Sequence, residues 1–210
     1  SWYTVQNRVI LSRNSTKDTT FKFCYKNLMR LFVFILFLNF LSISNIYSSE
    51  RDKELNKLFL ELKVNNINLA YETEQKIWKI WSTHPTDKNL TEILEKGSNL
   101  VNRNQLIDAI NVFTNLINLD PYWAEAWNKR ATVFYIIGEY QKSQDDIDKV
   151  LELEKRHFGA LAGQGLVNIK LENYEKAIIS YEKAQKIYPS MKSPKIMIEQ
   201  IEELIKKQSI

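Results

Sequence analysis

Large apolar and small side chains recur along this chain with a period of 34 residues. The repeat is seen when three segments are aligned: 90–123, 124–157 and 158–191. In each segment a large apolar residue is followed four positions later by a small one. Further along each segment, a small residue is followed by a bulky one. A small residue lets a neighbouring helix approach closely, and a bulky one fills the space between helix pairs. The period therefore predicts three stacked helical hairpins with these contact residues: Ile93, Gly97, Ala109 and Phe113; Trp127, Ala131, Ser143 and Ile147; Leu161, Gly165, Ala177 and Tyr181.

Residues suited to sharp turns stand where the two helices of each hairpin would meet. Asn104, Gly138 and the pair Glu172-Asn173 occupy these positions, where a left-handed backbone favours glycine or asparagine. Pro121 and Pro189 end the first and third segments. The whole chain has 5 Gly and 4 Pro in 210 residues, which favours helices joined by short turns over a many-stranded β fold.

Amphipathic stretches on both sides of the repeats predict further helices. An apolar stripe runs through residues 51–63, and apolar residues also recur over 70–82. We interpret residues 50–89 as a capping hairpin before the first repeat, with a swapped or partner-binding segment as the alternative. Residues 192–210 are expected to form a capping helix after the third repeat. The stripe residues in the first stretch are Leu55, Leu58, Phe59 and Leu62.

This arrangement resembles the tetratricopeptide repeat family over residues 90–191. The resemblance implies an all-α fold, a right-handed superhelical solenoid of helix-turn-helix hairpins with N- and C-terminal capping helices. In this family the first helix of each hairpin lines a concave groove that binds a protein or peptide. By repeat position, the groove residues would be Asn102, Asn128, Lys129, Thr132, Tyr135, Leu166, Ile169 and Lys170.

These groove residues suggest how a peptide would be bound. Asn128 and Lys129 are expected to bind a peptide backbone or carboxylate, whereas Tyr135, Leu166 and Ile169 would contact apolar side chains. The carboxylate clamp of some family members needs basic and asparagine residues in three successive repeats. Because the third repeat offers small and apolar residues at most inner positions, we do not predict that clamp.

The N-terminal part of the chain has the order of a secretory signal. Basic residues end at Arg30, a 14-residue apolar run covers 31–44, and small polar residues follow. A bilayer-spanning helix needs roughly 20 residues, so a cleaved signal is favoured over an anchor. We expect a signal peptide or signal anchor over 29–49, a natural start at Met29, and a non-native or disordered segment over 1–28. The expected location is periplasmic or secreted, with inner-membrane anchoring as the alternative.

Charge and chemistry narrow the function further. Six of the 29 basic and one of the 25 acidic residues lie in 1–49, so the remainder has 23 basic against 24 acidic side chains, which argues against a nucleic-acid partner. The lone Cys24 lies in the leader, and the two histidines, His84 and His157, lie at separate turns. We therefore predict no catalytic residue, metal or cofactor.

The tryptophans are interpreted as packing residues. Trp78, Trp81 and Trp127 fall on apolar faces, whereas Trp123 is expected to be exposed at the turn before the second repeat. The resulting hypothesis is an exported, non-enzymatic adaptor that binds a protein or peptide in its concave groove. The alternative is a membrane-tethered scaffold that self-associates through its N-terminal helices.

Overall fold

The computed structural model describes residues 50–64 and 66–208, and the predicted leader over 1–49 therefore lies outside the described residues. In the described part of the unit that begins at Arg51, the regular elements are all helices. Within that part, no helix has the length and apolar character needed to cross a bilayer. A helical segment covers 51–61 and is followed by α2 (Ile67–Ser82), α3 (Lys88–Asn102), α4 (Leu106–Leu119), α5 (Ala124–Ile136), α6 (Tyr140–Leu153), α7 (Phe158–Lys170), α8 (Tyr174–Ile187) and α9 (Lys192–Gln208).

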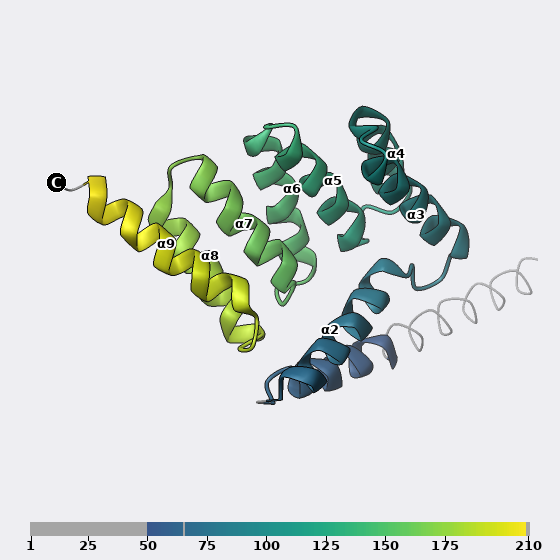
Figure 1. The fold of residues 1–210 in the computed structure, drawn as a ribbon. Coiled ribbons are helices and arrows are strands. Elements are labelled where there is room, and N and C mark those ends of the chain that lie inside the picture. The colour runs from purple at the N-terminus through teal and green to yellow at the C-terminus, as the bar shows by residue number, and fades with distance from the viewer. Residues whose placement is uncertain (1–49, 65, 209–210) are drawn as a thin grey trace, which may run out of the picture. The chain divides into compact units, whose positions relative to one another are not determined.

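The helices α3 to α8 form three hairpins, one in each 34-residue repeat. Each helix packs on the next along the chain, and α9 packs on α8 after the third hairpin (Figure 1). The turns within the hairpins use the left-handed backbone at equivalent positions, with φ of 57° at Asn104, 83° at Gly138 and 59° at Glu172. Glutamate in this region costs about 1–2 kcal/mol relative to glycine, which the packed helices on either side must offset.

The alternation of small and bulky residues produces the close contacts that the sequence predicts. A Cβ atom added to Gly165 would lie 2.5 Å from Cζ of Tyr181, and Gly97 faces the ring of Phe113 in the same way. Both rings are buried within their hairpins. The glycines are therefore required by the space that the aromatic rings occupy, since overpacked cores are strained.

The helical segment 51–61 and α2 form a hairpin, here called the N-terminal hairpin (residues 51–64 and 66–82). Its predicted apolar stripe is buried, but in one cluster with Phe158 and Tyr188, which lie at the start and end of the third repeat. The Tyr188 hydroxyl donates to Glu74 Oε2 of α2 at 3.1 Å, and the Arg156 guanidinium lies 4.4 Å from the Phe59 ring. The hairpin thus packs along the turns between repeats. We had expected it to cap the first repeat.

The position of the N-terminal hairpin also changes the interpretation of Trp123. This residue was expected to be exposed, but its side chain is buried and its Nε1–H donates to the carbonyl oxygen of Trp81 at 2.8 Å. The expectation was wrong because a segment distant in sequence covers the turn at which Trp123 lies. The periodic pattern within the repeats does not predict that the N-terminal hairpin buries this turn.

Candidate functional site

A small pocket opens between α5 and α7, the first helices of the second and third repeats. Its volume is about 80 Å³. Its lining includes small residues, which are Ala131 of α5 and Gly159, Ala160 and Gly163 of α7, together with larger polar and apolar ones. The lining residues are Asn128, Ala131, Thr132, Tyr135, Ser143, Ile147, Gly159, Ala160, Gly163, Leu166 and Val167.

Four of the eight residues predicted for the groove lie together in this pocket: Asn128, Thr132, Tyr135 and Leu166. The amide nitrogen of Asn128 donates to Glu125 Oε2 at 3.1 Å, which fixes the orientation of its side chain. The Thr132 hydroxyl donates to the Asn128 carbonyl oxygen at 3.0 Å. Leu166 is 37% exposed, so an apolar ligand group could reach it from solvent.

The other four predicted residues do not line the pocket. The Nζ atom of Lys129 lies 3.3 Å from Glu125 Oε1, a charge contact without hydrogen-bond geometry. Ile169 packs into the cluster that joins α8 and α9, and it therefore contributes to the C-terminal core. Asn102 and Lys170 are the exposed last residues of α3 and α7. Lys129 and Ile169 have partners within the chain that repeat position alone does not reveal.

A buried pair of polar side chains lies beside the pocket. Glu125 and His157 are both fully buried, and Nε2 of His157 lies 3.1 Å from Glu125 Oε2. The Nδ1 atom of His157 accepts the Ala160 backbone N–H at 3.0 Å, so the ring proton lies on Nε2 and is donated to the carboxylate. Burial opposes ionisation of Glu125, but the hydrogen bonds from His157 and Asn128 and the nearby Lys129 outweigh it and lower its pKa.

The N-terminal hairpin covers this pair. The Trp81 indole stacks on the His157 imidazole with ring centroids 4.0 Å apart and planes 9° apart, and Trp78 meets the same imidazole edge-on at 5.4 Å. These rings cover the His157 imidazole on the side of the hairpin. The burial of Glu125 could not be predicted from the sequence, because a glutamate four residues before a lysine is typical of an exposed helix face.

The second histidine lies two hairpins earlier in the chain and has an equivalent arrangement. His84 Nε2 lies 2.8 Å from Asp120 Oδ2, and its Nδ1 accepts the Asp87 backbone N–H at 2.9 Å. Both histidines thus pack at turns, as the sequence indicated. Among the described residues, no group of three His, Cys, Asp or Glu side chains is placed to bind a metal ion.

Comparison with known proteins agrees with the repeat geometry. A family model for the tetratricopeptide repeat matches residues 159–191, which form the third hairpin. A TPR repeat-containing protein from Rhizobium etli is 29% identical over 144 residues, which cover 68% of this chain and 70% of the relative. Residues 159–191 thus match a tetratricopeptide repeat, and the chain is similar to tetratricopeptide repeat proteins. The first and second hairpins have the same two-helix form as the third, at the same 34-residue period.

More distant relatives share a smaller part. Sperm-associated antigen 1 from Homo sapiens is 22% identical over 119 residues, which are 57% of this chain but 13% of that protein. The solved first TPR domain of Spaghetti (RPAP3), bound to an HSP90 peptide, superimposes with a TM-score of 0.54 at 19% identity and covers 55% of this chain and 92% of that domain. At this identity the superposition shows that the two proteins share a fold.

Proposed function

We propose that this protein is an adaptor without catalytic activity that binds an extended segment of a partner protein between α5 and α7. The observation that carries this proposal is the pocket of about 80 Å³, because its lining combines apolar side chains with the Asn128 amide and the Thr132 hydroxyl. An aliphatic side chain of the ligand enters the pocket, and the polar groups bind the ligand backbone. The Spaghetti domain, which has the same fold and is bound to an HSP90 peptide, supports the binding of a peptide by this chain.

The charges around the pocket indicate which ligands it selects. Lys129 is the basic residue nearest in sequence to the pocket's polar groups, and its ammonium group already lies 3.3 Å from the buried Glu125 carboxylate. A lysine held in this way contributes little to binding a terminal carboxylate, since its charge is compensated. We therefore propose that the pocket binds an uncharged segment with a side chain the size of valine or leucine.

Filling the pocket is expected to weaken this binding. Gly163 lines the pocket, and a Cβ atom there would have only ordinary contact with Ile147 Cδ1 at 3.6 Å, so a Gly163→Leu side chain can extend into the space. Short uncharged peptides selected by display against the full chain would be measured by calorimetry. We expect Gly163→Leu to weaken their binding at least about tenfold, which corresponds to about 1.4 kcal/mol.

A matched control separates this effect from a general loss of apolar surface. Ile107 on α4 is 64% exposed and does not line the pocket, so Ile107→Ala is expected to leave the affinity unchanged. Thermal unfolding of both variants would show whether the fold is retained. Selected peptides that bind Gly163→Leu as tightly as the original protein would contradict the proposed groove.

Export from the cytoplasm is a further part of the proposal, supported by the basic and then apolar order of the leader sequence. The alternative, an anchored and self-associating scaffold, is favoured by exposed apolar side chains on the N-terminal hairpin: Leu60, Val64, Ile67 and Tyr71. Cell fractionation with mass analysis of the native N-terminus, followed by sedimentation, distinguishes the two. A soluble monomer starting near residue 45 supports the exported adaptor, whereas a membrane-bound species whose mass rises with concentration supports the scaffold.

A further inference from the structure

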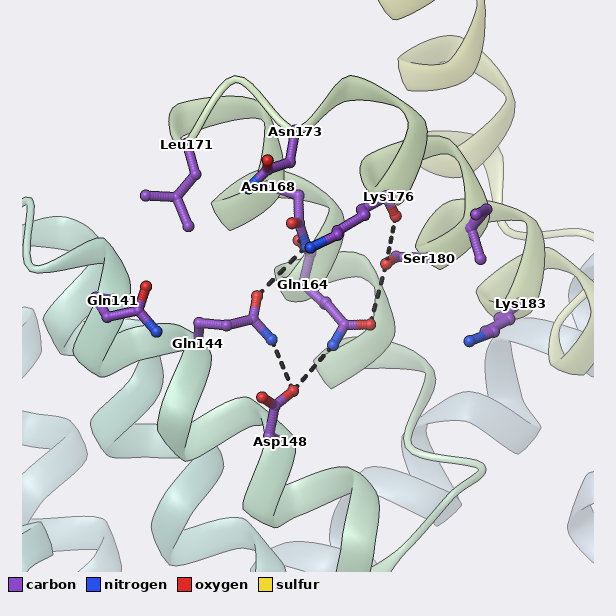
Figure 2. A pocket seen from close by; sticks show the side chains of 11 residues that line it. Gln141, Gln144, Asp148, Gln164, Asn168, Leu171, Asn173, Lys176, Ser180 and Lys183 are labelled. Atoms are coloured by element: carbon purple, nitrogen blue, oxygen red, sulfur yellow. Dashed lines mark hydrogen bonds between the residues drawn. The ribbon is translucent and has the colours of Figure 1, made fainter.

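A second, larger and more polar hollow lies between α6 and α8, with α7 at its base (Figure 2). Its volume is about 380 Å³, and it shares no lining residue with the pocket between α5 and α7. Three rows of side chains from the three helices face it. They are Gln141, Gln144 and Asp148 from α6, Gln164 and Asn168 from α7, and Lys176, Ser180 and Lys183 from α8.

The equivalent space one repeat earlier is bridged by an arginine. Arg130 of α5 donates from Nη2 and Nε to the two carboxylate oxygens of Asp146 at 2.7 and 2.8 Å, and from Nη1 to the Thr114 hydroxyl at 3.0 Å. These three groups join α4, α5 and α6. Asp146 is buried and bound bidentately, so this space has its own internal cation and anion.

In the third repeat a glutamine replaces that arginine. Gln164 lies 34 residues after Arg130 and links the corresponding positions, because it donates to Asp148 Oδ1 at 3.2 Å and accepts from the Ser180 hydroxyl at 3.0 Å. The carboxamide is shorter than a guanidinium group and carries no charge. The hollow is therefore left open, and it has no internal arginine to balance the charges around it.

The lysines of the third repeat have also lost their partners. In the second repeat, Lys142 Nζ lies 3.3 Å from Glu139 and Lys149 Nζ lies 2.9 Å from Glu152. Thirty-four residues later, Lys176 and Lys183 are retained, but the partner positions hold Asn173 and Lys186. Among the described residues neither Lys176 nor Lys183 forms an ion pair, and both side chains extend from α8 toward the hollow (Figure 2).

The single carboxylate in the lining does not compensate these two charges. Asp148 Oδ1 accepts hydrogen bonds from the amide groups of Gln144 at 2.7 Å and Gln164 at 3.2 Å, and neither donor is charged. Two ammonium groups therefore face one carboxylate that is occupied by neutral donors. Gln141 Nε2 donates to Asp145 Oδ1 at 2.9 Å, which leaves the Asn173 amide as a further donor in the lining. The remaining positive charge, together with this amide, favours an anionic ligand with further hydrogen-bond acceptors.

We propose that the hollow between α6 and α8 is a second binding site, which takes an acidic segment of a partner protein with a side-chain carboxylate between Lys176 and Lys183. A volume of about 380 Å³ admits such a side chain together with neighbouring backbone. This site is separate from the pocket between α5 and α7 and does not depend on the ligand bound there. It would let one chain hold two segments of different chemistry.

The test uses a hexaglutamate peptide with blocked ends, titrated calorimetrically into the full chain at low ionic strength. We expect saturable binding at one site, with an affinity at least about tenfold lower in the double variant Lys176→Gln/Lys183→Gln. Hexaglutamine is expected not to bind. The matched control is Lys142→Gln/Lys149→Gln, which removes the same number of charges from the equivalent positions of α6 and is expected to retain the affinity within about twofold.

Three results would overturn the proposal. Equal losses in both double variants would mean that hexaglutamate responds to overall charge and not to the hollow. Undiminished binding by Lys176→Gln/Lys183→Gln would place the peptide elsewhere. Glutarate that binds as tightly as the peptide would indicate a site for a small dicarboxylate. The variant Gly163→Leu, which fills the other pocket, is expected to bind hexaglutamate normally, so failure of the two sites can be told apart.

Discussion

Replacement of Trp81 by alanine is expected to release the N-terminal hairpin from the repeats and to cost about 3–5 kcal/mol of folding free energy. The Trp81 side chain is 4% exposed and joins the hairpin to the third repeat. Its ring stacks on His157 at 4.0 Å and packs against Phe158 at 5.2 Å and Phe59 at 6.0 Å. Removal of the indole leaves a cavity where these three rings meet, and the buried Glu125–His157 pair loses its cover.

Urea unfolding and amide hydrogen exchange would measure this effect. Exchange is expected to accelerate most in residues 67–82, because α2 opens before the repeats unfold. The control is Trp81→Phe. Because the Trp81 Nε1–H has no hydrogen-bond partner, this substitution removes apolar contacts but no hydrogen bond. A smaller loss, about 1–2 kcal/mol, is expected for that variant. If α2 exchanges at its original rate in Trp81→Ala, the hairpin is held by contacts other than those of Trp81.

Removal of the Glu125 carboxylate is the change with the second largest expected effect. We expect Glu125→Ala to destabilise the protein by about 3 kcal/mol, because it leaves a buried His157 Nε2–H donor without an acceptor. Asn128 and Lys129 lose the same carboxylate, which Asn128 Nδ2 contacts at 3.1 Å and Lys129 Nζ at 3.3 Å. Chemical unfolding at neutral pH would measure the loss. Glu95 on α3 is exposed, so Glu95→Ala is a control with little expected effect.

The effect of Glu125 has a predicted pH dependence. Its pKa is lowered in the folded protein, where burial is outweighed by the hydrogen bonds from His157 and Asn128 and the charge of Lys129. The stabilisation is therefore present above the unfolded value, about 4.3, and is lost as the pH falls through the lower folded pKa. The stability difference between the original protein and Glu125→Ala should narrow when unfolding is measured at acid pH. A difference that widens on acidification would contradict this assignment.

The position of a groove residue could be predicted from sequence only where the residues that it contacts belong to the repeats. Asn128, Thr132, Tyr135 and Leu166 reach one pocket because repeat position determines which face of α5 and α7 they occupy. Ile169 occupies the same face, but it packs into the cluster with Ile201 of α9. Lys129 is bound by a carboxylate whose burial depends on the distant N-terminal hairpin.

The sequence by itself determined the three hairpins. A contact such as that of Gly165 with Tyr181 joins neighbouring helices of one hairpin, and its residue pattern recurs every 34 residues. The tertiary structure decided where the N-terminal hairpin lies, since an amphipathic stretch reveals that one face is buried but not which surface covers it. The hollow between α6 and α8 depends on the sequence and on the tertiary structure together. The change from Arg130 to Gln164 is visible in the aligned repeats, whereas the open space it leaves depends on the distances between three packed helices.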